Sequence, residues 1–224
     1  MNEIISAIDF LHTIKKDGHT LFHGDIKSSN VCLDQNYTAK MIDCGLAKFV
    51  PKGSSVITNP IPSSVCYTAG DGVYGTLGYY MCPYHLQGEK YVSACDVYSF
   101  GIVMIELVTG CLQNDRTKLG QFSERYFPSN FEGNPAEALE SAIPKLMEDV
   151  DRIAEEWEDG ILSSVCTLAI HCIQNNRTKR PTTNELVEKL GQLVRPVAIQ
   201  MVISHAESSG GRSGHVKAGV TKTC

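Results

Sequence analysis

The sequence has 224 residues, of which 42% are hydrophobic and 20% are charged, and its formal net charge is −5. This balance is typical of one globular domain with a sizeable core and excludes a fibrous or fully disordered chain. The mild negative charge gives no reason to expect nucleic acid or an anionic membrane as a partner. The longest apolar stretch, near residues 100–108, is too short and too interrupted to cross a bilayer, so no transmembrane segment is expected.

The cysteines indicate a reducing environment. There are nine of them, an odd number without paired spacing, and residues 1–16 lack the basic start and apolar run of a signal peptide. Free thiols and a cytoplasmic location are therefore expected, rather than a disulfide framework. Cys95, Cys166 and Cys172 fall on apolar faces, which predicts small core residues without a catalytic role.

The first part of the chain alternates between short elements and loops. Apolar residues recur at helical spacing over residues 2–15, which predicts an amphipathic helix ended by Asp17-Gly18. Between residues 20 and 42, short apolar pieces broken by Gly, Asp and Asn predict small strands and tight loops. Residues 51–75 are rich in Pro, Gly, Ser and Thr and lack periodicity, so we expect a long exposed loop.

The second part of the chain is predicted to be helical. Residues 94–109 are apolar nearly all round, which predicts a buried central helix. Residues 134–159 form an acidic stretch of helical pattern, with Trp157 as its one large apolar anchor. Two further helices are expected over residues 162–173 and 182–193.

The strongest chemical signal is the segment 23–30, which reads His-Gly-Asp-Ile-Lys-Ser-Ser-Asn. An acid followed two residues later by Lys and five residues later by Asn resembles the catalytic loop of protein kinases. A hydroxyl that attacks a γ-phosphate needs a carboxylate to accept its proton, which would be Asp25. Lys27 could stabilise the charge on the phosphoryl oxygens, and the amide of Asn30 could supply an oxygen ligand for Mg²⁺.

Three later segments follow in the order that this family has. Residues 43–47, Asp-Cys-Gly-Leu-Ala, resemble its Asp-Phe-Gly motif, so Asp43 and Asn30 are expected to hold the metal. Residues 75–84 resemble the end of an activation segment. Asp96 matches an Asp at the start of the central helix, and the resemblance implies that it braces the backbone of the catalytic loop.

Each segment alone could be a surface pair, a turn or a helix cap, but four in this order exceed coincidence. Over roughly residues 2–195 the chain resembles the C-terminal lobe of a eukaryotic-type protein kinase. The catalytic loop is similar to those of the interleukin-receptor-associated (IRAK) and Pelle kinases and of plant receptor-like kinases, and Lys27 is typical of Ser/Thr kinases. The resemblance implies a mainly α fold, a helical bundle with small β-hairpins at the catalytic loop. It also implies a floor for ATP made by Val31, Cys32 and Leu33, with Asn30, Cys32 and Asp43 as the cofactor-binding residues.

The resemblance also suggests boundaries. A polar, Gly-rich stretch predicts a disordered tail over residues 204–224, after a partial kinase domain over residues 1–203. Only 22 residues precede His23, too few for the N-terminal lobe, whose glycine-rich loop and lysine position the phosphates of ATP. We therefore expect that lobe to be absent. ATP and Mg²⁺ would then serve the full-length parent, and this chain alone would not bind them tightly and would be inactive.

Three substitutions depart from the family pattern. Gly24 stands where many members have an Arg that pairs with a phosphate on the activation loop. Cys44 replaces a Phe and is expected to leave the packing between the lobes underfilled. Tyr84 replaces a Glu whose buried Arg partner is best matched by Arg180, so Arg180 is expected to need another partner or to reach water.

Two functions remain open. A parent Ser/Thr kinase would phosphorylate a protein substrate, as the joint presence of Asp25, Lys27, Asn30 and Asp43 suggests. Alternatively, the chain is a non-catalytic, pseudokinase-like binding module or decoy for a signalling adaptor, in the cytoplasm or in the intracellular part of a receptor-like parent. The loop before Tyr84 is either a regulatory phosphorylation target or a solvated polar loop. Its hydroxyl residues are Ser54, Ser55, Thr58, Ser63, Ser64 and Thr68.

Overall fold

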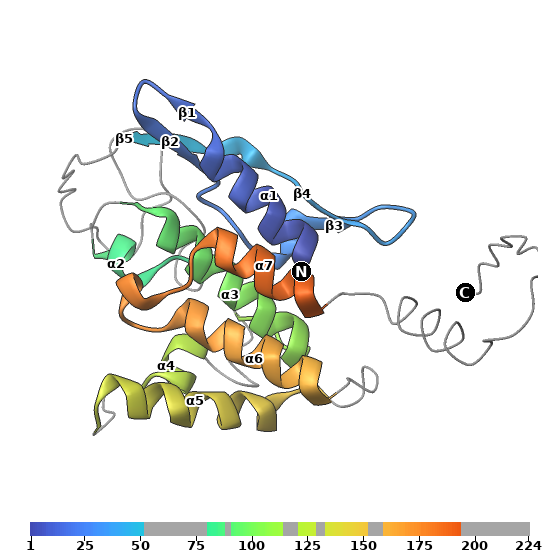
Figure 1. Ribbon diagram of the computed structural model, residues 1–224, viewed down its shortest axis with the longest axis vertical. Helices are drawn as coiled ribbons and strands as arrows, with labels where there is room; N and C mark the ends of the chain where they lie inside the picture. The colour runs from blue at the N-terminus through green and yellow to red at the C-terminus, as the bar shows by residue number, and fades with distance from the viewer. Residues whose placement is uncertain (52–79, 88–90, 114–120, 129–132, 152–158, 194–224) are drawn as a thin grey trace, which may run out of the picture. The chain divides into compact units, whose positions relative to one another are not determined.

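The architecture is that of helices packed around one buried helix, with two small sheets at one end (Figure 1). The structure is a computed structural model and describes residues 1–51, 80–87, 91–113, 121–128, 133–151 and 159–193. The α-helices are α1 (Asn2–Thr13), α2 (Pro83–Leu86), α3 (Ser93–Thr109), α4 (Phe122–Tyr126), α5 (Pro135–Asp149), α6 (Asp159–Ile173) and α7 (Thr183–Leu193). The strands are β1 (Lys15–Lys16), β2 (His19–Phe22), β3 (Val31–Leu33), β4 (Ala39–Met41) and β5 (Lys48–Pro51). Three 3₁₀ turns complete the described elements: η1 (Ser28–Asn30), η2 (Cys44–Leu46) and η3 (Arg177–Lys179).

Helix α3 is the buried central helix that the sequence predicts. Its side chains are apolar on nearly every face and most are fully buried, Phe100, Ile102 and Met104 among them, because the other elements cover it from several sides. It packs most closely against α6, and Gly101 lies at their crossing. The helix ends at Gly110, which adopts φ 62°, the left-handed conformation that glycine favours at a helix end.

The N-terminal helix is shorter than predicted. Helix α1 buries its apolar stripe against the core but ends at Thr13, whereas the periodicity extended to residue 15. Asp17 and Gly18 both have positive φ, 51° and 76°, and two such residues form the tight turn that joins antiparallel strands. The Asp17-Gly18 pair therefore closes the β1–β2 hairpin and does not end the helix, so that part of the prediction is wrong.

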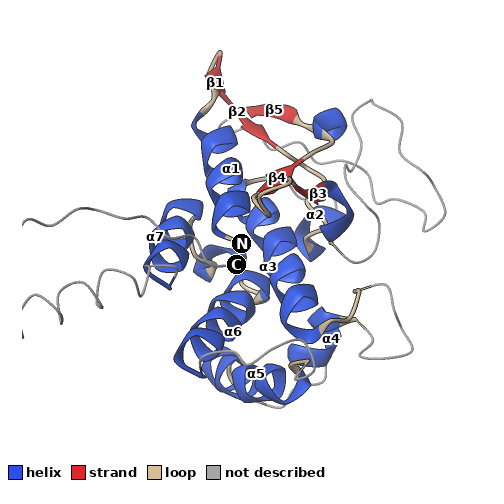
Figure 2. Cartoon of the chain, turned by 90° about the vertical axis from the view of Figure 1, so that its right-hand side faces the viewer, coloured by secondary structure: helices blue, strands red, loops and turns tan. Residues whose placement is uncertain are grey.

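The two sheets flank the segment that carries the proposed chemistry. One has the strand order β1-β2-β5 and the other pairs β3 with β4, all antiparallel. The register pairs Phe22 with Lys48 in the first sheet and Val31 with Met41 in the second. Residues 23–30, which include η1, connect the two sheets, so both sheets hold the ends of this connection (Figure 2). The small strands between residues 20 and 42 are confirmed, while β5 was not predicted.

Helices α5 and α6 lie below α3 in Figure 1, whereas α7 packs against α1. Helix α5 begins with a capping box formed by Asn134 and Glu137 and ends at Asp149, ten residues before the predicted end at 159. The predicted anchor, Trp157, lies outside the described residues. Cys95, Cys166 and Cys172 are buried, which confirms them as small core residues.

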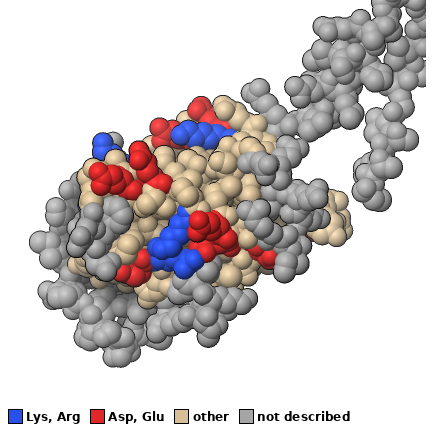
Figure 3. All heavy atoms as spheres, turned by 90° about the horizontal axis from the view of Figure 1, so that it is seen from below, with Lys and Arg blue, Asp and Glu red and all other residues tan. Residues whose placement is uncertain are grey.

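Charges on the face around α5 are of both signs. Arg125 of α4 forms a bidentate ion pair with Asp149, and the Nζ of Lys145 donates to the backbone oxygen of Arg125 at 2.9 Å. Figure 3, which views the molecule from below, shows acidic and basic side chains interspersed among neutral ones on this face. The described side chains therefore present no broad surface of one sign in this view.

Several predicted features lie outside the described residues. They are the hydroxyl-rich loop at 52–75, most of the segment 75–84, and the tail at 204–224. Among the helices that the structure describes, none is long and apolar enough to span a membrane.

Gly101 offers a test of the α3–α6 packing. A Cβ at this position would lie 2.5 Å from the Cβ of Cys172 and 2.8 Å from the Cγ2 of Ile173, so Gly101→Ala must force the two helices apart. We expect a loss of about 1–3 kcal/mol in the free energy of unfolding, measured with urea.

The control for this variant is Gly160→Ala in α6, where a Cβ would meet no atom within 4 Å. Because alanine favours helix over glycine, this change should leave stability unchanged or raise it. Equal stability of the two variants would contradict the tight crossing at Gly101.

Candidate active site

One buried carboxylate fixes the backbone of the catalytic loop. Asp96 of α3 is fully buried and accepts hydrogen bonds from the backbone N–H groups of His23 and Gly24, each at 3.1 Å. Its oxygens also contact the Nε2 of His12 at 2.8 Å and accept from the hydroxyl of Tyr91 at 2.5 Å. The prediction that Asp96 braces this loop is therefore confirmed.

The surroundings of Asp96 keep it ionised. Burial acts to raise the pKa of this carboxyl, but the contacts with His12, Tyr91 and the backbone of Gly24 outweigh burial and hold the pKa below its ordinary value. A carboxylate with four polar contacts is satisfied without water, which is the condition for keeping a charge in a core.

Gly24 has a structural reason in this arrangement. Its φ is 78°, and a Cβ would lie 3.1 Å from the backbone oxygen of Leu46. A larger residue would be strained at this φ and crowded by η2. The residue at 24 is thus fitted to the close approach of the two loops.

Asp25, Lys27 and Asn30 are brought together. Asp25 is only 7% exposed, and its Oδ2 accepts from the Nζ of Lys27 at 2.7 Å and from the Nδ2 of Asn30 at 3.2 Å. The same Asn30 nitrogen donates to the backbone oxygen of Asp25 at 2.9 Å, and the backbone N–H of Asp25 donates to the Nδ1 of His23 at 3.3 Å. The carboxylate is therefore held in one orientation by its own loop.

The backbone of Asp43 lies next to this cluster, but among the described residues its side chain forms no hydrogen bond with Asp25, Lys27 or Asn30. The backbone N–H of Ile42 donates to the backbone oxygen of Asn30 at 2.9 Å, which places Asp43 one residue beyond that link. Asp43 is exposed, adopts φ 58°, and accepts from the N–H of Gly45 at 3.2 Å.

The oxygens of Asn30 and Asp43 suit a hard cation. Because the amide nitrogen of Asn30 is committed to Asp25, its amide oxygen is the atom that could face a metal. An exposed Asp43 carboxylate adds a second oxygen, and Mg²⁺ commonly takes one or two protein oxygens with phosphates and water. In the part of the chain that the structure describes, no three His, Cys, Asp or Glu residues cluster as a metal site.

The surface next to the loop is apolar and open. In β3, Val31 is half-buried, while Cys32 and Leu33 are exposed. Ile42 and Leu46, which lie close to Asp43 in the sequence, are also exposed, at 42% and 37%. Large apolar residues exposed together beside a polar site are unusual and mark a surface that binds a ligand or a partner.

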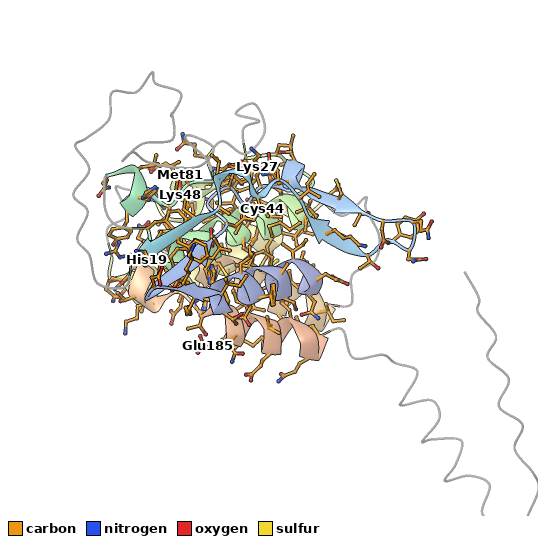
Figure 4. The ribbon with its side chains drawn as sticks, turned by 90° about the horizontal axis from the view of Figure 1, so that it is seen from above. His19, Lys27, Cys44, Lys48, Met81 and Glu185 are labelled. Atoms are coloured by element: carbon orange, nitrogen blue, oxygen red, sulfur yellow. The ribbon has the colours of Figure 1, made fainter. Side chains whose placement is uncertain are left out.

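Cys44 is solvent-exposed in η2. Figure 4 looks down on this side and places Cys44 and Lys27 away from Glu185 of α7. That Cys44 leaves the packing between two lobes underfilled stays a prediction.

Arg180 has found partners other than an acidic residue. It is buried, and it donates to the Sγ of Cys82 and to the backbone oxygen of Ala94. Tyr84, in the position of the family's Glu, instead places its ring 4.9 Å from the guanidinium of Arg177. The expectation that Arg180 needs another partner is confirmed.

Comparison with known proteins decides the family. A profile described as "Protein kinase domain" matches residues 1–190. The chain belongs to the protein kinase family. The kinase fold and the receptor-like and Ser/Thr relatives agree with the resemblance drawn from the catalytic loop, while the narrower likeness to IRAK and Pelle stays a prediction.

Three relatives from Arabidopsis thaliana illustrate the similarity. The chain is 30% identical to "Probable serine/threonine-protein kinase PBL28" and 31% identical to "Probable serine/threonine-protein kinase PBL8", over 94% and 84% of this kinase chain. It is 32% identical to "Receptor protein-tyrosine kinase CEPR1" over 76% of its length. These alignments cover 49%, 40% and 16% of the respective relatives, so the chain spans half of their length or less.

Two residues of the bracing network were not predicted as such. His12 lies on the apolar stripe of α1, four residues after Ile8, and helical spacing places it in the core but cannot name its partner. Tyr91 precedes α3 and carries no periodic signal. Both residues contact the carboxylate of Asp96. His12 is distant from Asp96 in the sequence, whereas Tyr91 precedes it by only five residues.

The bracing role of Asp96 can be tested by Asp96→Asn. The amide has the same shape as the carboxylate, but its NH₂ group would face buried N–H and O–H groups that also donate. We therefore expect a loss of about 3–5 kcal/mol in the free energy of unfolding. Tyr91→Phe, which removes one donor, should lose about 1.5–3 kcal/mol.

The pH dependence of the same variant has a defined sign. Because the folded pKa of Asp96 is lowered, its stabilisation is complete above the unfolded value of about 3.9 and is lost as pH falls through the folded pKa. The difference between wild type and Asp96→Asn in urea unfolding should shrink only in acid. A difference that is absent at neutral pH would contradict the bracing role.

Proposed function

We propose that the chain is the C-terminal lobe of a Ser/Thr protein kinase whose N-terminal lobe belongs to a longer parent protein. The parent would transfer the γ-phosphoryl group of Mg-ATP to a hydroxyl of a protein substrate. The observation that carries this proposal is the joint hold of Lys27 and Asn30 on the Asp25 carboxylate, next to a loop whose backbone is braced by Asp96.

Asp25 is proposed as the residue that orients the substrate hydroxyl and accepts its proton. Its Oδ2 is committed to Lys27 and Asn30, which fixes the plane of the carboxylate. Lys27, whose ammonium lies 2.7 Å from Asp25, is proposed to stabilise negative charge on the transferred group. Fixed orientation matters because small misplacements lower rates steeply.

Asn30 and Asp43 are proposed as the metal ligands through one oxygen each. Bound Mg²⁺ would neutralise charge on the phosphates of ATP. Cys32 is proposed to lie beneath the adenine ring as part of an apolar floor with Val31 and Leu33. The exposed apolar residues at this surface suggest that another part of the protein covers them. In the parent this would be the N-terminal lobe with its nucleotide.

The hydroxyl class rests on the motif and on relatives. Lys27 in the catalytic loop is typical of Ser/Thr kinases, and two of the relatives are named as such, whereas a third is named a tyrosine kinase. We propose Ser/Thr, and phosphoamino-acid analysis of a substrate labelled by the parent would distinguish the two classes.

A second candidate function is a non-catalytic module that binds a signalling adaptor. It is favoured by Cys44, by Tyr84 in place of an acidic residue, and by the open apolar surface beside the catalytic loop. Under this proposal the four polar residues would be retained without turnover.

Asp25→Asn in the full-length parent tests the catalytic proposal. Loss of the proton acceptor should lower kcat by about 10²- to 10⁴-fold with little change in stability. Phosphate transfer to the substrate is the measurement. The matched control, Asp34→Asn in the turn between β3 and β4, makes the same change at a carboxylate that binds only its own turn and Lys40, and it should leave kcat unchanged. Full activity of Asp25→Asn would contradict the assignment.

This chain alone is expected to bind nucleotide weakly. Because binding to the folded state raises stability in proportion to ln(1 + [L]/Kd), millimolar Mg-ATP should leave the melting temperature of the 224-residue chain unchanged. A rise of several degrees would show that this lobe holds ATP without its partner lobe. An in-frame glycine-rich loop upstream in the coding sequence would favour the kinase over the binding module.

A further inference from the structure

A buried guanidinium lies where the segment before α7 meets the start of α3. Arg180 is 6% exposed, and a guanidinium stays positively charged in proteins. Within the ranges that the structure describes, no carboxylate forms an ion pair with it. A buried charge without a counter-ion is strongly destabilising. The groups around Arg180 must therefore compensate the positive charge of its guanidinium.

One of these neighbours can carry a full negative charge. The Nη1 of Arg180 lies 3.0 Å from the Sγ of Cys82 and donates to the backbone oxygen of Ala94 at 2.9 Å. Its Nε donates to the backbone oxygen of Gln174 at 3.0 Å, and its guanidinium lies 4.8 Å from the ring centre of Tyr98. Two carbonyls and a ring offer only partial charges, whereas a thiol can ionise.

A second thiol completes the surroundings of this sulfur. Cys82 and Cys95 are both buried, at 1% and 0% exposure, and a hydrogen bond between the two thiols is the largest cause of the pKa shift of each. The contact from Cys95, opposed by burial and aided by Arg180, lowers the pKa of Cys82 to about 5. The same contact and burial raise the pKa of Cys95 well above its ordinary value. Both directions favour a thiolate at Cys82 and a thiol at Cys95.

We propose that Cys82 is a thiolate, that it is the buried counter-ion of Arg180, and that Cys95 stabilises it by donating its thiol hydrogen. The arrangement ties the segment entering α2 to the start of α3 and to the segment before α7. It supplies at Cys82 the negative charge that Tyr84 cannot supply. The proposal does not depend on whether the chain transfers phosphate.

Other titratable groups face this site from four elements. They are Asp96, Tyr91 and Tyr98 at α3 and its approach, His85 of α2, Cys172 of α6 and Arg177 of η3. Burial raises the pKa of Tyr98 to about 12 and that of Tyr91 well above its ordinary value, so both rings are neutral at ordinary pH. Asp96 is ionised and engaged by its own four contacts, and His85 contacts the ring of Tyr91.

The thiolate of Cys82 makes the free energy of unfolding depend on pH. An unfolded thiol has a pKa of about 8.5, above that of folded Cys82, so the folded chain binds fewer protons in between. The stabilisation from Cys82 is therefore complete above the unfolded pKa and is lost as pH falls through the folded one.

The thiolate itself can be measured by its ultraviolet absorbance in the full 224-residue chain at neutral pH. Wild type should absorb more than Cys82→Ser by the contribution of one thiolate. The control, Cys166→Ser, removes another fully buried thiol whose pKa burial raises to about 11, and it should match wild type. Equal absorbance of wild type and Cys82→Ser would overturn the proposal.

Unfolding experiments give a second readout. Cys82→Ser should lose the rise of stability with pH across the neutral range, while Cys82→Asp, which keeps a negative charge, should recover much of the stability at neutral pH. If the serine variant does not fold, wild type alone suffices, because urea unfolding at neutral pH should abolish most of one thiolate's absorbance. An absorbance that does not fall on unfolding would reject the thiolate.

Discussion

The buried carboxylate of Asp96 is the constraint on which the site depends. It is fully buried, and its polar contacts come from α1, from the catalytic loop and from the approach to α3. An ionised group in this position tolerates only an arrangement that satisfies it. The backbone of His23 and Gly24 is therefore fixed relative to α3. Because Asp25 follows directly in the chain, this also fixes the position of its carboxylate.

The first turn of α3 serves two ionic sites at once. Asp96 holds the catalytic loop on one side, and its neighbour Cys95 faces Cys82 and Arg180 on the other. The rest of the helix is mostly apolar and buried, with Ser99, Glu106 and Thr109 as its buried polar residues, so it provides the rigid support that both sites need. The two ionic sites share its first turn, and the remainder contributes mainly packing energy.

The sequence predicted the parts of the fold whose signals are local. Apolar residues on all faces identified α3, and the spacing of Asp25, Lys27 and Asn30 identified a cluster that the structure brings together. It missed the hairpin turn at Asp17-Gly18, because a turn pair and a helix stop look alike until the paired strand is known. The roles of Asp43 and Cys32 stay predictions, since their partners would be ligands rather than residues of this chain.

The long sequence separation of the Asp96 contacts has a consequence for synthesis on the ribosome. Gly24 and its acceptor are 72 residues apart, and translation proceeds at about 5–20 residues per second. The nascent catalytic loop therefore waits about 4–14 s, from that rate, before its anchor has even been made. During this interval the loop and its apolar surroundings are exposed without their brace, so correct geometry at Asp25 arises only after α3 has emerged and docked.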